Sequence, residues 1–104
     1  MSDVRTIYVG SKPIHAYVAA VLRAMQNGDR KVELVARGGA IRTAVDTAEI
    51  CRRRNGNIAS LLPEMVNNGV EIGTEQLDSE GVTRTLSFIK IQLEGIGDLP
   101  DEEE

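Results

Sequence analysis

The stretch Arg37–Ile41, with the sequence RGGAI, joins a short apolar run to the start of an amphipathic pattern. Gly10–Pro13 (GSKP) makes the same kind of junction earlier in the chain. Each junction combines glycine with a basic residue at a predicted helix start, where backbone N–H groups and the positive end of the helix dipole favour an anion. Two such junctions in a chain of 104 residues predict a phosphate-binding surface.

Apolar patterns predict the elements on either side of both junctions. Runs of β-branched and aromatic residues predict strands, and apolar residues three and four positions apart predict amphipathic helices. We therefore expect strand, helix, strand and helix over residues 4–9, 13–27, 31–37 and 41–55. In the second helix a spacing of four pairs Arg42 with Asp46 and Glu49 with Arg53. Such pairs stabilise a helix by only about 0.2–0.5 kcal/mol each.

The second half of the chain predicts a β-hairpin. Residues 70–77 and 82–93 have strand character, and Asp78–Gly81 supplies the turn between them. Residues 57–68 predict a connection with one or two helical turns and a local apolar anchor, because Pro63 disfavours a longer helix.

The order β-α-β-α-β-β predicts an α+β fold, a two-layer sandwich. A strand-helix-strand crossover is right-handed, so both helices are expected on one face of a four-stranded mixed sheet. The two junctions then share one edge of the sheet, where Lys12 and Arg37 point outward together. We expect this domain to span residues 1–95, and residues 96–104 to form an acidic, disordered tail because they have little apolar content.

Charge is divided unequally along the chain. Residues 1–54 hold ten Lys and Arg against five Asp and Glu, whereas residues 55–104 hold two against eleven, within a net charge of −4. This asymmetry favours a nucleic-acid partner. No apolar run approaches the roughly 20 residues that span a bilayer, and the N-terminus lacks an apolar signal region. We therefore expect a cytoplasmic protein with no membrane partner.

The reactive side chains do not predict an enzyme, a metal site or a cofactor. Cys51 falls on the apolar stripe of the second helix and is expected in the core, while His15 is expected at the surface. Neither has the ligand set or the neighbouring base that metal binding or nucleophilic catalysis needs. The glycines lack the Lys-Ser/Thr ending of a nucleotide P-loop. Tyr17 is interpreted as a core or interface aromatic, and three aromatics in all give weak support to single-strand stacking.

Two longer segments carry a family resemblance, Tyr8–Val18 (YVGSKPIHAYV) and Ala36–Ile50 (ARGGAIRTAVDTAEI). They resemble the signature segments of the Alba family of small archaeal chromatin proteins, Ile-Gly-Lys-Lys-Pro with a following Tyr-Val, and Ala-Arg-Gly-x-Ala-Ile with a following Ala-Val-Asp and Glu-Ile. The similarity covers residues 4–54 and extends over the hairpin from Gly81 to Leu93. It implies a homodimer, or a heterodimer with a paralogue, that binds double-stranded DNA or RNA with little sequence preference.

The resemblance and the charge pattern together give a set of candidate contacts. Lys12 matches the second lysine of the family loop, and Arg37 matches the family arginine. For Arg42, a salt bridge with Asp46 is the alternative to a nucleic-acid contact. The helix dipole makes a capping role nearly as good an explanation for the basic run that ends the second helix. The candidate nucleic-acid contacts are Ser11, Lys12, Arg37, Gly38, Gly39, Arg42 and Arg84, with Arg52, Arg53 and Arg54 as secondary basic contacts.

The chain departs from the family pattern at several of these positions. Ser11 replaces the first loop lysine, and Gly39 stands where relatives often have a second arginine. Val82 and Thr85 occupy hairpin positions that can be basic, and Asn55 stands where relatives can carry an aromatic residue that packs dimers side by side. The residues that this chain lacks at these positions serve tight binding, the hairpin contact and filament formation in relatives.

We therefore predict a chromosome-associated architectural protein that contacts backbone phosphates. The resemblance also implies that a loop lysine such as Lys12 can be acetylated. RNA is an alternative to DNA, because a reader of shape and phosphate accepts an A-form duplex. A protein-interaction or scaffold subunit, which uses the acidic half against a basic partner, is the alternative from another class.

Overall fold

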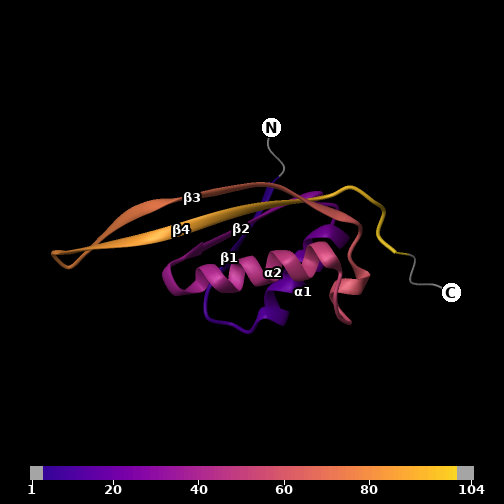
Figure 1. Ribbon diagram of the computed structural model, residues 1–104, viewed down its shortest axis with the longest axis horizontal. Coiled ribbons are helices and arrows are strands. Elements are labelled where there is room, and N and C mark those ends of the chain that lie inside the picture. Colours follow the sequence, from indigo (N-terminus) through magenta and orange to yellow (C-terminus); the bar gives the residue numbers. More distant parts are fainter. Residues whose placement is uncertain (1–3, 101–104) are drawn as a thin grey trace.

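The computed structural model describes residues 4–100 as a sheet covered on one face by two helices (Figure 1). The elements in chain order are β1 (Val4–Val9), α1 (Ile14–Gln26), β2 (Lys31–Arg37), α2 (Ile41–Arg53), β3 (Met65–Ser79) and β4 (Val82–Gly95). Short 3-10 turns, η1 (Gly38–Ala40) and η2 (Ala59–Leu61), precede and follow α2. The strand order is β1-β2-β4-β3, with β1 parallel to β2 and the other neighbours antiparallel. The predicted fold class is confirmed.

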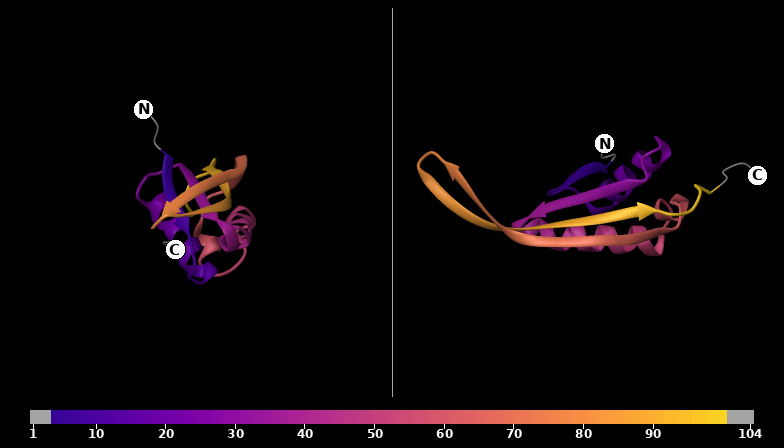
Figure 2. Two further views of the ribbon diagram at one scale, coloured as in Figure 1. Left: turned by 90° about the vertical axis from the view of Figure 1, so that its left-hand side faces the viewer. Right: turned by 90° about the horizontal axis from the view of Figure 1, so that it is seen from above.

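The core lies between the sheet and the two helices (Figure 2). The apolar stripe of α1 buries Val21 completely, and Val32 and Leu34 of β2 meet it from the sheet. On α2 the stripe includes Cys51, which is fully buried, so its predicted core position is confirmed. Residues of β4 that alternate along the strand, such as Leu93, complete this layer. Both helices bury the apolar face that the spacing of their apolar residues predicts.

Strands β3 and β4 extend beyond the body as a long arm, and the molecule measures 58 × 31 × 19 Å (Figures 1 and 2). The predicted hairpin is confirmed, with Glu80 and Gly81 at its tip in positive-φ conformations of 53° and 79°. Positive φ at both central residues matches the twist of the flanking strands. The first strand of the hairpin, β3, begins at Met65 and not at residue 70 as predicted, because Met65 is buried and pairs with Gly95. A register irregularity between Asn67 and Gly69 interrupts that pairing.

The connection between α2 and β3 is held by the predicted apolar anchor. Arg54 ends α2 in a left-handed conformation with φ 55°, and η2 supplies one short turn. Leu62 is fully buried, and Pro63 is less than 2 % exposed. The connection is therefore an ordered part of the body.

The chain stays attached to the body beyond Gly95. The backbone N–H groups of Ile96 and Gly97 donate to the Glu64 carbonyl at 2.8 and 3.3 Å. Arg30 donates to the carbonyls of Gly95 and Gly97, and the partly buried Leu99 packs against the core. Ile96, Gly97 and Leu99, which fall within the predicted tail, therefore contact the body. The remaining tail residues, 101–104, lie outside the described range.

Within residues 4–100, neither helix is long and apolar enough to cross a membrane.

Candidate nucleic-acid interface

The two glycine-containing junctions meet in one groove. Because β1 and β2 are parallel, α1 and α2 begin at the same edge of the sheet. The groove has a volume of about 420 Å³ and is lined by Gly10, Ser11, Lys12, Gly39, Ala40 and Thr43. The sequence prediction that the junctions share an edge is confirmed. Within the described chain Lys12 has no ion-pair partner, so its ammonium group is available to an anion.

Tyr17 holds the backbone of the first junction, Gly10–Pro13, through its hydroxyl group. Its hydroxyl oxygen accepts hydrogen bonds from the backbone N–H groups of Gly10 at 2.8 Å and Lys12 at 2.9 Å. Tyr17 as a whole is 6 % exposed and belongs to the core. Two N–H groups of the loop are therefore committed to Tyr17 rather than to a phosphate. Sequence analysis placed Tyr17 in the core or an interface but missed this role.

Both helix starts at the groove lack a capping side chain in the part of the chain that the structure describes. Pro13 precedes α1, Ala40 precedes α2, and neither first turn contains an acidic residue. Ser11 therefore does not cap α1. The Ile41 N–H group at the start of α2 donates to the Gly38 carbonyl of η1. Helix starts without a side-chain cap, and helix dipoles without an opposing carboxylate, make this edge favourable for an anion.

Arg37 lies at the same edge but faces the arm instead of the groove. Its Nε donates to Oε1 of Glu75 at 2.5 Å, and its Nη2 donates to Oε2 at 3.4 Å. Phe88 is the register partner of both Arg37 and Gly73, and its ring occupies the space where a Gly73 Cβ would stand, at 2.6 Å. Glu75 lies two residues beyond Gly73 on the same face of β3, where the guanidinium reaches it.

The Arg37–Glu75 contact stabilises the charged form of both partners. The hydrogen bond and charge of Arg37 hold the pKa of the Glu75 carboxyl below its usual value. The same contact raises the pKa of the Arg37 guanidinium. Lys12 and Arg37 are thus separate cations at one edge, and the second already has an anionic partner.

Two further arginines pair on the surface of α2. Nε of Arg42 lies 3.7 Å from a carboxylate oxygen of Asp46, which confirms the predicted pair. The predicted partner of Glu49 is wrong: Arg52, three residues away, binds its carboxylate through Nε at 3.0 Å and Nη2 at 2.7 Å. Residues three and four apart share a helix face, so the spacing alone did not decide between Arg52 and Arg53. The hydrogen bond from Arg52 lowers the pKa of Glu49.

The remaining candidate cations lie away from the groove. Arg52, Arg53 and Arg54 stand at the far end of α2, about 20 Å along a helix of 13 residues. Arg54 donates through Nη1 to the Leu62 carbonyl at 3.5 Å. Arg84 is exposed near the arm tip, opposite Leu77. The structure therefore does not bring these four side chains together with Lys12.

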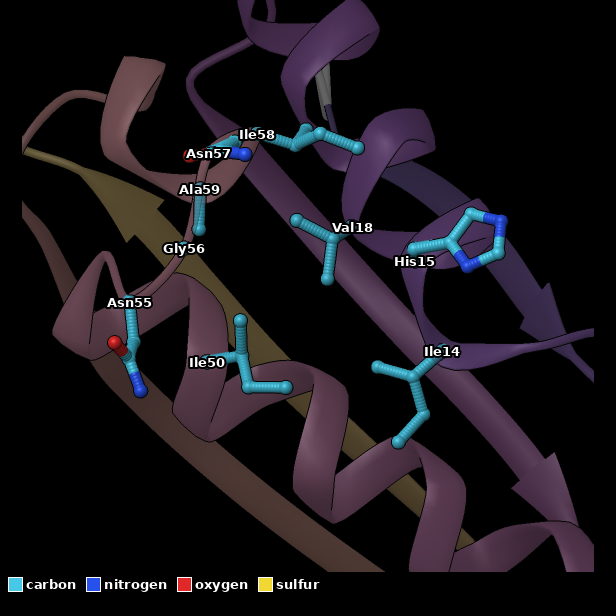
Figure 3. Close-up of a pocket in the computed structure, with 9 residues that line it drawn as sticks. All are labelled: Ile14, His15, Val18, Ile50, Asn55, Gly56, Asn57, Ile58 and Ala59. Carbon is cyan, nitrogen blue, oxygen red and sulfur yellow. The ribbon is translucent and has the colours of Figure 1, made fainter.

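An apolar hollow of about 370 Å³ separates α1 from the segment that follows α2. In Figure 3 Ile14 and Val18 of α1 and Ile50 of α2 line the space between the helices, and Asn55 stands at its end. His15 lies at the rim and is exposed. Asn55 stands where relatives can carry the aromatic residue that packs dimers side by side.

Cys51 is fully buried and does not line the groove. Burial raises the pKa of the Cys51 thiol to about 12, so the nucleophilic thiolate is scarce near neutral pH. Residues 4–100 contain no cluster of three or more metal-ligating side chains.

Comparison with known proteins identifies the family. The Alba family model matches residues 5–61, more than half of the chain. The chain belongs to the Alba family. It is 43 % identical over 88 residues to the DNA/RNA-binding protein Alba 1 of Archaeoglobus fulgidus, covering 85 % of this chain and 92 % of the relative. It is 36 % identical to the DNA/RNA-binding protein Alba of Methanothrix thermoacetophila, covering 89 % and 98 %.

Solved Alba structures share the fold. Alba from Thermoplasma volcanium superposes with a TM-score of 0.72 at 36 % identity, covering 86 % of this chain and 99 % of that chain. An Alba protein of Trypanosoma brucei superposes with a TM-score of 0.67 at 18 % identity, covering 88 % and 68 %, a likeness of fold alone. The names of the curated relatives describe DNA/RNA-binding proteins rather than enzymes, in agreement with the non-catalytic prediction.

Proposed function

We propose that this protein binds double-stranded nucleic acid through backbone phosphates, as a dimer and with little sequence preference. The observation that carries the proposal is the groove in which Lys12 meets two uncapped helix starts. Membership of a family whose relatives are named DNA/RNA-binding proteins supports the same ligand.

The proposed mechanism is electrostatic. The ammonium group of Lys12 neutralises one phosphate, and N–H groups at the starts of α1 and α2 add hydrogen-bond donors. Ser11 and Gly39 are small residues that line the groove and leave room for a phosphate, and Gly38 supplies the positive φ of the turn before α2. Arg37 supplies a second cation where the arm leaves the body. Because these groups address phosphates, binding releases counterions and carries no base information.

The arm contributes less charge than the body. Beside Arg84 it carries Glu75, Asp78 and Glu80, and Glu71 lies nearer the body opposite Lys90. This excess of carboxylates weakens any phosphate contact along the arm, so Arg84 and the distant Arg52–Arg54 run are secondary contacts in the proposal. The acidic arm is also the observation that favours the alternative function, a scaffold subunit that docks a basic protein.

DNA and RNA duplexes both fit this mechanism, and one comparison separates them. The protein should shift unrelated DNA duplexes with equal affinity, and each complex should dissociate as salt rises. A duplex RNA of the same length in the same assay shows which form is preferred. Absence of any shift at low salt, together with capture of a basic protein partner by the arm, would favour the scaffold function.

We propose that the dimer forms over the apolar surface beside α2 and β3. Ile72 is 74 % exposed, and Ile41 and Ile89 line a hollow next to it. Val45 of α2 and Val70 of β3 are also exposed. A run of exposed apolar side chains is typical of a protein interface.

Light scattering tests the dimer. The parent is expected at twice the chain mass of 11.3 kDa at tens of micromolar concentration. Ile72→Glu should give a monomer, because it places a carboxylate in the apolar contact. Val82→Glu at the arm tip is the matched control and should leave the mass unchanged. A parent monomer, or an Ile72→Glu dimer, would refute this interface, and a dimer formed only with a paralogue would replace the homodimer.

Association with the chromosome, and control of binding by acetylation of Lys12, follow from the same proposal. Acetylation removes the charge of the ammonium group and leaves one N–H donor in place of three. Acetylated protein should therefore bind duplex as weakly as the Lys12→Ala variant.

A further inference from the structure

We propose that the Glu75 carboxylate occupies the phosphate position on Arg37 and competes with nucleic acid for that guanidinium. This inference rests on the proposed function. It adds an internal competitor, on the arm of the same chain, that sets how tightly the body binds.

The geometry of the contact is that of a phosphate clamp. The guanidinium donates through Nε and Nη2 to two oxygens of one carboxylate. This edge of the planar fork also fits two oxygens of a phosphate. A phosphate that binds Arg37 in this way must first displace Glu75.

The contact is accessible and therefore exchangeable. The Arg37 side chain is 41 % exposed and that of Glu75 is 32 % exposed. An exposed ion pair of this kind changes an equilibrium by roughly two- to fivefold, too little to close the site permanently. A glutamate carboxyl is ionised near neutral pH, and the contact with Arg37 lowers the pKa of Glu75 further, so the competitor is charged in the unbound protein.

The position of Glu75 couples this exchange to the arm. Glu75 pairs in register with Leu86, just beyond the last β2–β4 pair, Arg37 with Phe88. Glu75 thus joins the end of β2 to the root of the arm. When Arg37 binds a phosphate instead, this ion pair between β2 and the arm is lost.

Three variants separate this competition from a general effect of charge. Glu75→Gln removes the carboxylate, and Glu75→Asp keeps the charge but shortens the side chain by one methylene, so that it no longer spans to Arg37. Glu71→Gln is the control, because Glu71 lies on the same face of β3, opposite Lys90, and carries the same charge. Each is titrated with one DNA duplex at low salt, alone and combined with Arg37→Ala.

Competition predicts that Glu75→Gln binds roughly two- to fivefold more tightly per subunit than Glu71→Gln. Glu75→Asp should also bind more tightly than the parent, although its net charge is unchanged. Both gains should vanish in the Arg37→Ala background, because the competitor then has no target.

Two results would overturn the inference, and they differ from failure of the proposed function. If Glu75→Gln equals Glu71→Gln, or keeps its gain without Arg37, Glu75 acts only through its charge. If Glu75→Gln binds more weakly than the parent, Glu75 orients Arg37 and does not compete. Failure of the proposed function would appear separately, as parent-like binding by both Lys12→Ala and Arg37→Ala.

Discussion

Replacement of both Lys12 and Arg37 by alanine is expected to weaken duplex binding by at least about a hundredfold at low salt. A charge-assisted hydrogen bond contributes about 1.5 kcal/mol or more, so each phosphate contact that is lost costs roughly a factor of ten in affinity. Two lost contacts give the hundredfold minimum, and the four contacts of a dimer in which both subunits bind give a larger loss. The loss should be equal on two unrelated duplexes, because phosphates carry no sequence information. Fluorescence anisotropy on labelled duplexes measures it, and circular dichroism checks that the variants are folded.

Lys31→Ala provides the matched control for this prediction. Lys31 is an exposed lysine at the start of β2, at the opposite edge of the sheet from Arg37. Its removal makes the same change in net charge as Lys12→Ala alone and should reduce affinity far less than Lys12→Ala does. Equal losses in Lys31→Ala and Lys12→Ala would mean that only overall charge matters and that the groove is not a site.

Tyr17→Phe is expected to destabilise the fold by about 1–3 kcal/mol, because two backbone N–H groups lose their common acceptor. The ring still fills its place in the core, so the cost arises from the hydroxyl alone. Urea unfolding followed by circular dichroism measures the change in the free energy of unfolding. The loop of Gly10 and Lys12 also loses its fixed position, so duplex affinity should fall under conditions where the variant stays folded.

Tyr8→Phe separates this effect from the general loss of a phenol. Tyr8 is 69 % exposed, so its hydroxyl can reach water, and its removal should change stability by no more than about 0.5 kcal/mol. Parent-like stability of Tyr17→Phe would show that the two N–H groups find water as readily as the hydroxyl. In that case Tyr17 would have no role in positioning Lys12.

Local sequence patterns were sufficient for most of the fold. The β-branched and apolar runs over residues 4–9 and 31–37 predicted β1 and β2 with the observed bounds. The start of β3 was harder, because Met65 joins the sheet through its pairing with the distant Gly95. The contacts of Ile96 and Gly97 with Glu64, and of Gly97 with Arg30, were not predicted either, because they leave no local pattern.

The candidate site was predictable in outline but not in its polar contacts. Parallel β1 and β2 place Ser11, Lys12 and Gly39 at one edge, which follows from topology. The contact of Arg37 with Glu75 joins residues 38 positions apart in sequence. The hydrogen bonds from Gly10 and Lys12 to the Tyr17 hydroxyl depend on the position of the tyrosine side chain beneath the loop. Neither depends on a spacing that a single sequence reveals.

The dependence of affinity on salt tests the central claim most directly. The logarithm of the binding constant is measured against the logarithm of salt concentration for the parent and for the variant that lacks both Lys12 and Arg37. If the parent dimer uses these side chains to neutralise phosphates, the variant's slope should be less steep by roughly 0.9 for each phosphate left without its cation, or about 3.6 for four phosphates. A variant with the same slope and affinity as the parent would contradict phosphate binding at this edge.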